Sequence, residues 1–249
     1  MAARRTVKTT GVKPSQRAPL VARSPRTRAD RQKIATVVLQ RLTAEYPDAH
    51  CALVHRSAFE LLVATILSAQ CTDVRVNMVT PALFARYPNA RKLSAARPAD
   101  VETLIKSAGF FRAKTRSLLA MSASLVAEHN GEVPHTLAEL VALGGVGRKT
   151  ANVVLGNAFN INEGIVVDTH VQRLSRRLGL TREADPVAIE RALVPLFPRE
   201  KWTYLSHLLI SHGRLVCIAR KPLCHRCVLS DICPSAGLPA EVSPSATAG

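Results

Sequence analysis

The stretch Leu143-Gly144-Gly145-Val146-Gly147-Arg148-Lys149-Thr150-Ala151 lies where one run of helically spaced apolar residues ends and the next begins. Glycines at such a turn allow left-handed backbone angles and let another chain approach closely. The free N–H groups at the start of the following helix attract anions. The stretch therefore predicts a helical hairpin that holds a phosphate without reading base sequence. It is not a nucleotide-binding P-loop, because the spacing G-x-x-x-x-G-K-[ST] is absent.

Two charged residues in and after this hairpin are candidates for chemistry. Lys149 falls in the first turn of the second helix, where the helix dipole disfavours a further positive charge. Such a lysine can be a nucleophile that forms a Schiff base with a carbonyl carbon, although holding a phosphate is the commoner role. Asp168 precedes another helical stripe and is predicted to be its N-cap. Its carboxylate could also stabilise a cationic sugar or help to deprotonate the lysine.

The rest of the chain, away from its two ends, follows a helical pattern almost throughout. Ser57 and Glu60 have the spacing of a capping box, and a buried stripe follows them. No convincing strand hairpin is present, so the sequence predicts an all-α protein with about ten helices. The further apolar stripes are Val101–Ile105, Leu118–Val126, Leu137–Val141, Val153–Phe159, Val171–Leu178, Ile189–Phe197 and Trp202–Val216.

The composition points to a polyanionic partner. The chain has 249 residues, with 34 Lys and Arg against 18 Asp and Glu, so its net charge is +16. No apolar run is long enough to span a membrane. Residues 1–29 are rich in basic residues and lack an apolar period, which predicts a disordered tail that either contacts DNA or is merely solvated. Residues 237–249 are predicted to form a second flexible tail.

Four of the six cysteines are close together near the carboxyl end. Cys217, Cys224, Cys227 and Cys233 have the spacing C-x6-C-x2-C-x5-C. Four thiolates this close together can bind one centre, either a [4Fe–4S] cluster or a structural zinc ion. The spacing alone puts zinc somewhat ahead, because four-cysteine zinc sites are common. Cys51 and Cys71 are interpreted as small buried hydrophobic residues.

Taken together, these motifs resemble the endonuclease III family of helix-hairpin-helix DNA glycosylases. The resemblance covers residues from about 31 to 236 and includes several motifs in the right order. One departure is Gly144, where the family commonly has a proline that stiffens the entry to the hairpin. The matching segments are Leu67–Asp73, Leu143–Ala151, Val167–His170 and the cysteine loop that begins at Cys217.

The resemblance implies a two-lobed, all-α fold that binds double-stranded DNA in the cleft between its lobes. A six-helix bundle with the helix-hairpin-helix motif would comprise residues 52–163. Residues 30–51 and 164–236 would form a lobe that carries a [4Fe–4S] cluster. The cluster ligands implied are Cys217, Cys224, Cys227 and Cys233. A monomer is expected, in the cytoplasm and associated with the bacterial nucleoid.

The resemblance also implies an enzyme of base-excision repair. Such a bifunctional glycosylase and lyase removes oxidised pyrimidines and cleaves the resulting abasic site by Schiff-base β-elimination. Lys149 would be the Schiff-base lysine and Asp168 the catalytic aspartate. One alternative is the same scaffold acting on a pyrimidine dimer or a mismatch. The other is a non-catalytic DNA-binding protein with a structural metal, which has no need for this pairing of lysine and aspartate.

Further residues are candidate DNA contacts by the same resemblance. Gln70 would enter the gap left by the flipped base. Phe110, where some relatives have leucine, would be either a wedge between bases or a core residue. The backbone N–H groups of Gly145 and Gly147 would meet phosphate. The remaining candidates are Arg148, His170, Arg220 and Lys221.

Overall fold

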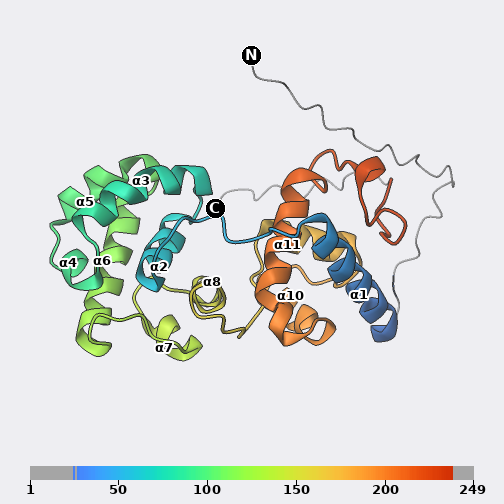
Figure 1. The fold of residues 1–249 in the computed structure, drawn as a ribbon, viewed down its shortest axis with the longest axis horizontal. Coiled ribbons are helices and arrows are strands. Elements are labelled where there is room, and N and C mark those ends of the chain that lie inside the picture. The colour runs from blue at the N-terminus through green and yellow to red at the C-terminus, as the bar shows by residue number, and fades with distance from the viewer. Residues whose placement is uncertain (1–24, 26, 238–249) are drawn as a thin grey trace, which may run out of the picture.

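The fold consists of two helical lobes side by side (Figure 1). The structure is a computed structural model that describes residue 25 and residues 27–237. All regular elements within these residues are helices, which confirms the predicted all-α class. None of these helices is both long and apolar enough to cross a bilayer. Most of the predicted amino-terminal tail and residues 238–249 lie outside the described residues, and the first helix begins at Arg28.

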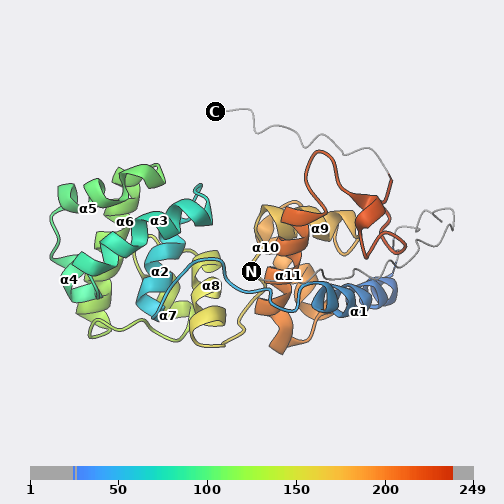
Figure 2. The ribbon, with the colours of Figure 1, turned by 45° about the horizontal axis from the view of Figure 1, so that its top comes forward.

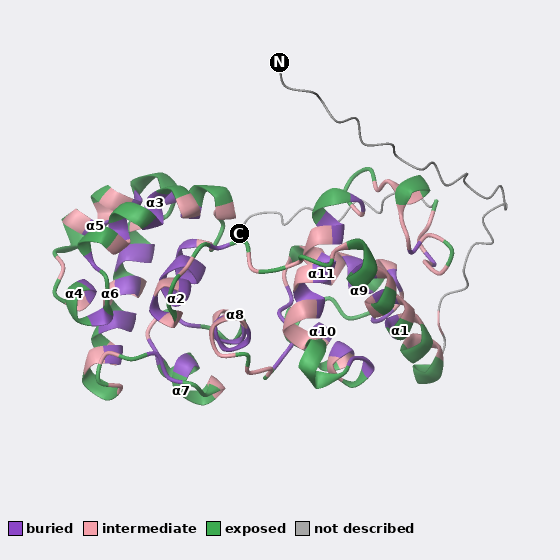
Figure 3. Ribbon diagram, viewed as in Figure 1, coloured by how far each residue is buried: buried purple, intermediate pink, exposed green. Residues whose placement is uncertain are grey.

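The first lobe contains the hairpin and one hydrophobic core. Buried residues from Leu53 to Leu155 form this core, with Cys51 and Cys71 packed against it. Figure 3 shows the buried faces of these helices turned inward. The elements of this lobe are α2 (Ala58–Leu67), α3 (Asp73–Arg86), α4 (Ala90–Ser94), α5 (Pro98–Ile105), the 3-10 turn η1 (Lys106–Ala108), α6 (Phe111–Glu128), α7 (Leu137–Ala142) and α8 (Arg148–Ala158).

The second lobe joins the amino-terminal helix to the carboxyl-terminal half of the chain. Ala35, Val38 and Leu42 from the first helix enter the same core as residues from Ile165 to Leu229. The cysteine loop lies at the far end of this lobe from α2–α8 in both views (Figures 1 and 2). The elements are α1 (Arg28–Glu45), α9 (Thr169–Arg177), α10 (Pro186–Leu193), η2 (Val194–Leu196), η3 (Arg199–Lys201), α11 (Trp202–Leu215) and η4 (Cys224–Arg226).

Local sequence signals explain where several helices begin. Ser57 caps α2 by accepting a hydrogen bond from the backbone N–H of Glu60 at 3.2 Å. The predicted capping box is only half formed, because the Glu60 carboxylate accepts from the N–H of Arg56 and not from that of Ser57. Thr72 caps α3, a helix that the apolar stripes of the sequence do not predict. Only four residues of α3 are buried, and Pro81 lies inside it, so its pattern in the sequence is weak.

The two lobes meet where α8 packs against α11. Gly156 makes this close approach possible, because a Cβ atom there would lie 2.1 Å from the Thr203 hydroxyl. Beside it, the imidazole Nε2 of His207 is 2.7 Å from the side-chain oxygen of Asn157. Burial lowers the pKa of His207 to about 4, so the ring is neutral at pH 7. His207 is thus a packing residue of the lobe junction.

The hairpin itself depends on Gly145. This residue has φ of +79°, a left-handed conformation that is costly for any residue with a side chain. A Cβ atom at Gly145 would also lie 2.7 Å from the Cβ of Ser117 on α6. Gly147 differs, because its φ is −91° and a Cβ there would meet no atom within 4 Å. The fold therefore requires a glycine at position 145. At Gly147 the missing side chain instead leaves open space at the start of α8.

We predict that Gly145→Ala destabilises the protein by about 2–4 kcal/mol, because backbone strain and overpacking add together. The matched control is Gly147→Ala, which should shift the midpoint of chemical denaturation much less, because alanine is only a poorer N-cap there and meets no neighbouring atom. Denaturation followed by circular dichroism measures both. Equal midpoints for the two variants would contradict this account of the turn.

Candidate active site and cysteine loop

The start of α8 presents backbone donors and an exposed amine together. Gly147 is the N-cap, and no side chain caps the helix. The first turn beyond it carries Lys149, whose side chain is exposed. Uncapped N–H groups at a helix start attract anions. The site therefore combines a helix end that can bind an anion with an accessible amine, and both roles of Lys149 stay predictions.

A pocket of about 310 Å³ lies beside this helix start. It joins residues that are far apart in the sequence, since α2, the turn after it, the start of α6 and the hairpin all contribute. Three predicted DNA contacts, Gln70, Phe110 and Gly145, line it together. The remaining lining residues are Thr65, Ile66, Ala69, Ala113, Lys114, Ser117 and Thr150.

Gln70 and Phe110 share an unusual backbone conformation on the rim of this pocket. Their φ angles are +51° and +46°, and left-handed angles are unfavourable for residues with large side chains. Gln70 is exposed, and the side chain of Phe110 is 68% exposed. The alternative in which Phe110 packs in the core is therefore wrong. Strained residues of this kind concentrate at binding sites.

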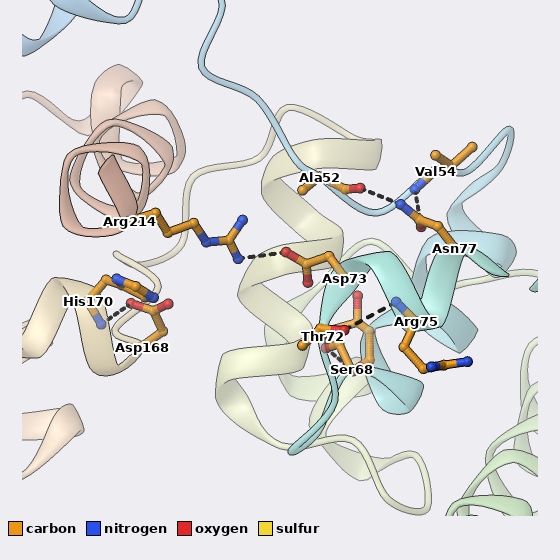
Figure 4. A network of polar contacts seen from close by, with 11 residues as sticks. Ala52, Val54, Ser68, Thr72, Asp73, Arg75, Asn77, Asp168, His170 and Arg214 are labelled. Carbon is orange, nitrogen blue, oxygen red and sulfur yellow. Dashed lines mark hydrogen bonds and ion pairs between the residues drawn. The ribbon is translucent and has the colours of Figure 1, made fainter. Parts of the chain in front are cut away.

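Asp168 caps α9 as predicted, through one oxygen of its carboxylate. Oδ1 accepts hydrogen bonds from the backbone N–H groups of His170 and Val171, both at 2.8 Å. The side chain is half-buried and lies beside the ion pair of Arg214 with Asp73, which joins the two lobes at 2.6 Å (Figure 4). The cap holds the carboxylate in place and leaves Oδ2 available to a ligand.

Lys149 and Asp168 begin two successive helices, and both helices contact α11. Their side chains make no hydrogen bond or ion pair with each other in the described part of the chain. Residues 159–167 connect the two helices, and this connection includes the buried run Ile165–Val167. The two helices that begin with Lys149 and Asp168 are thus both anchored on α11.

His170 lies beside Asp168 and is half-buried. Burial lowers its pKa, and the guanidinium groups of Arg173 and Arg214 act in the same direction, against the opposing effect of Asp168. Nη2 of Arg173 lies 3.2 Å from Nδ1 of the ring. A hydrogen bond to the backbone of Gly213 acts in the opposite direction and favours the protonated ring. His170 is therefore held beside Asp168 by contacts with α11 and with Arg173.

Of the three other cationic candidates for DNA contact, one is paired with a carboxylate and two are not, in the part of the chain that the structure describes. Arg148 makes a two-fold hydrogen-bonded ion pair with Glu190 of α10, at 2.9 and 3.0 Å. Its guanidinium therefore joins the hairpin to the second lobe, a role that sequence reasoning missed. Arg220 and Lys221 are both exposed at the start of the cysteine loop. Their side chains form no hydrogen bond or ion pair within the described residues.

Sequence reasoning also missed Arg214 and Lys114. Arg214 lies next to Gly213, whose missing side chain leaves space for the ring of His170. Lys114 is a buried lysine on the wall of the pocket, and burial lowers the pKa of its amine. Nothing in the sequence around Phe110 signals that a lysine four residues later is buried.

The cysteine loop receives hydrogen bonds from an arginine side chain and from the backbone. Arg177 donates a hydrogen bond to Sγ of Cys217 at 3.3 Å and others to the carbonyls of Ile218 and Ala219. Cys227 receives the backbone N–H of Leu229 at 3.4 Å. Donors of this kind stabilise thiolates and tune a metal centre. These hydrogen bonds therefore hold the sulfur atoms of Cys217 and Cys227 in fixed positions in the loop.

The four cysteines of the loop are close enough for their charges to interact. Burial raises the pKa of Cys227 to about 11, and the nearby Cys217, Cys233 and Cys224 add to the rise. A bound metal centre offsets such repulsion among thiolates. No three ligand side chains in the described ranges are set around a single-ion position. Thiolate donors as a class suit both zinc and an iron–sulfur cluster, but the described geometry forms no site for a single ion.

Comparison with known proteins identifies the two parts of the chain. Residues 63–199 match the family model described as HhH-GPD superfamily base excision DNA repair protein. Residues 217–233 match the iron-sulfur binding domain of endonuclease III, so the cysteine loop binds a [4Fe–4S] cluster. The four cysteines would hold it, and it would supply a rigid anionic centre for the loop.

Relatives and solved structures agree with these matches. Endonuclease III of Synechocystis sp. is 53% identical over 85% of this chain and 96% of its own. That of Bacillus subtilis is 43% identical over 78% of this chain and 89% of its own. A structure described as a trapped endonuclease III–DNA covalent intermediate with an estranged adenine is 43% identical. It covers 82% of this chain and 95% of its own, with a TM-score of 0.77.

We predict that purified protein is yellow-brown and contains about four iron atoms per chain, because a [4Fe–4S] cluster absorbs visible light and zinc does not. Cys227→Ser should lower the iron content strongly. Cys51→Ser, a change at a cysteine outside the loop, should leave it unchanged. Iron analysis and visible absorbance measure both variants. Colourless, folded protein with stoichiometric zinc would overturn the assignment.

Proposed function

The chain belongs to the endonuclease III family of HhH-GPD base excision DNA repair proteins, and we propose how its own residues carry out that repair. The protein is a bifunctional DNA glycosylase and abasic-site lyase that binds DNA. The observation that carries the proposal is the start of α8, where an exposed lysine follows a helix end with free backbone donors. In the assignment below, that end holds phosphate and the lysine attacks the sugar.

Lys149 is the nucleophile in this proposal. Its amine attacks C1′ of the damaged nucleotide, and the C1′–N bond breaks so that the base leaves with the bonding electrons. Ring opening then gives an imine between C1′ and the lysine nitrogen, with loss of a proton from nitrogen. The imine acidifies the C2′ proton, and its removal expels the 3′ phosphate by β-elimination. Exposure of Lys149 supports this role, because the amine must reach a sugar that DNA brings from outside.

Asp168 offsets the positive charge that develops on the sugar as the base departs. The two backbone donors on Oδ1 keep the carboxylate oriented before DNA binds, which is how preorganised charge lowers a barrier. The other oxygen is directed to the sugar or to the amine of Lys149, where it accepts a proton. Asp168 is therefore both a helix cap and an electrostatic catalyst.

Gln70 and Phe110 open the duplex in this proposal. Both side chains are exposed on the rim of one pocket, and both backbones are left-handed. Phe110 wedges between base pairs while Gln70 fills the space of the extruded nucleotide. The N–H groups near Gly145 and Gly147, with His170, Arg220 and Lys221, hold phosphates. Arg148 joins this set only if DNA displaces Glu190 from its guanidinium.

The substrate that we propose is an oxidised pyrimidine, or an abasic site, in double-stranded DNA. Membership of the endonuclease III family supports this lesion class, and activity on a pyrimidine dimer or a mismatch is the alternative. We propose that the protein acts as a monomer on nucleoid DNA in the cytoplasm. The two hydrophobic cores support lobe boundaries at 52–163 and at 30–51 with 164–236.

Lys149→Gln keeps a long polar side chain but removes the amine, so no imine can form. Borohydride trapping on an abasic duplex should therefore disappear, while DNA binding should largely persist through the helix end. Lys201→Gln, at an exposed position outside the site, is the control and should trap at the wild-type rate. Denaturing gels measure the cross-linked product. Undiminished cross-linking by Lys149→Gln would overturn the assignment.

Asp168→Asn retains an oxygen that can cap α9 but removes the negative charge. Base excision under single-turnover conditions should slow by about 100-fold to 1000-fold, since one electrostatic group in such a site has an effect of this size. Trapping on a preformed abasic site should suffer less, because the base is already gone. The control is Asp185→Asn, which changes a cap on α10 of the same kind. If the Asp168 variant excises bases normally, that residue is only a cap.

A further inference from the structure

Lys114 is a buried lysine on α6 that no part of the proposed chemistry uses. Its side chain is 5% exposed, and its Nζ donates a hydrogen bond to the carbonyl of Ala108 at 2.7 Å. Burying an amine is costly unless it has a partner. Burial also lowers the pKa of this amine, with a weaker opposing effect from Cys71. A lysine in such a position serves a specific contact, and here that contact is one backbone carbonyl.

The carbonyl of Ala108 lies immediately before a turn of unusual backbone conformation. Ala108 ends the 3-10 turn η1, and the two residues that follow, Gly109 and Phe110, both have left-handed backbone angles. The backbone N–H of Lys114 donates to the carbonyl of Phe110 at 3.0 Å. Lys114 therefore contacts both ends of the turn. Its side chain binds the carbonyl of Ala108, just before the turn, and its backbone N–H binds the carbonyl of Phe110, the second residue of the turn.

Nothing else on the turn offers comparable support. Phe110 is the N-cap of α6, and no side-chain hydrogen bond caps that helix. The phenyl ring is exposed, so burial of the ring does not stabilise the strained backbone beneath it. A Cβ at Gly109 would meet no atom within 4 Å, so packing does not hold that residue either. The turn keeps its conformation through hydrogen bonds to its two ends, and Lys114 provides one at each end.

We propose that Lys114 is a positioning residue, whose buried amine fixes the Gly109–Phe110 turn so that Phe110 stands ready to enter the duplex. The inference rests on the proposed role of Phe110 as the wedge. Preorganising the wedge matters because a loose turn would have to be ordered while the base pair is being opened. Lys114 also lines the pocket below Gln70, so its loss would alter that wall as well.

The principal test variant is Lys114→Met, which keeps the length and the apolar stem of the side chain but removes the donor. The matched control is Thr115→Val on the same helix. Thr115 is buried, and its hydroxyl has no hydrogen-bond partner, so valine changes the core without breaking a contact. Phe110→Ala is included to test the wedge itself.

Two readouts separate positioning from mere stability. The first is 2-aminopurine fluorescence beside 5-hydroxycytosine paired with guanine, which reports unstacking when the enzyme opens the duplex. The second is single-turnover excision of that base, compared with borohydride trapping on an abasic duplex. An abasic site has no base pair to break, so trapping depends less on the wedge. Excision is measured at saturating enzyme, so that weaker binding does not mimic slower opening.

Lys114→Met should reduce the fluorescence rise and slow excision about tenfold, which corresponds to about 1.4 kcal/mol. Trapping on the abasic duplex should stay within about twofold of the wild type, and Thr115→Val should match the wild type in every readout. Wild-type fluorescence and excision for Lys114→Met, when Phe110→Ala impairs both, would overturn the inference about Lys114 alone. Unimpaired Phe110→Ala would overturn the proposed wedge instead.

A second variant tests the same turn from its exposed side, in case Lys114→Met does not fold. The Cβ atom of a Gly109→Val side chain would meet no atom within 4 Å, but the φ of +69° is strongly unfavourable for a β-branched residue. It should loosen the turn without touching the core and give the same loss of fluorescence and excision. A folded Gly109→Val protein with wild-type values would show that the conformation of this turn is unimportant, and the inference would fail.

Discussion

One backbone constraint, the left-handed turn at Gly145, determines how the active site is assembled. The turn packs directly on Ser117 of α6, with no space for a side chain, and it sets the direction in which α8 leaves the hairpin. That direction brings the free helix start and Lys149 beside the pocket that Gln70 and Phe110 border. At its other end α8 packs against α11 through Gly156. The same helix therefore carries Lys149, the proposed nucleophile, and joins the lobes.

The charged side chains near the site form two groups, one that pairs across the lobes and one that has no partner in the described part of the chain. The ion pairs Arg148–Glu190 and Arg214–Asp73 join the lobes close to Lys149 and Asp168. Partly exposed pairs of this kind contribute modest stability, so their value lies in fixing geometry. The exposed Arg220 and Lys221 have no such partners within the described residues. In the proposed function they attract phosphate, which makes DNA binding depend on salt.

The cysteine loop extends this architecture at the far end of the second lobe. Arg173 and Arg177, both on α9, bind the carbonyls and the sulfur at the start of the loop, and Asp168 caps the same helix. Arg41 from α1 holds the opposite side of the loop through the carbonyl of Val228 and an ion pair with Asp231. The cluster lobe and Asp168, the proposed catalytic aspartate, therefore share one helix, which connects the cysteine loop to the position of the carboxylate.

Sequence alone determined the helical class, the hairpin, the cap at Asp168 and the set of four cysteines, because each depends on residues close together in the chain. Only the tertiary structure decided that Phe110 is exposed, that Arg148 pairs with Glu190, and that Lys114 is buried against Ala108. These outcomes depend on which distant segments meet. A phenylalanine or lysine in a helical pattern has the same local signal whether it faces a core, a partner or the solvent.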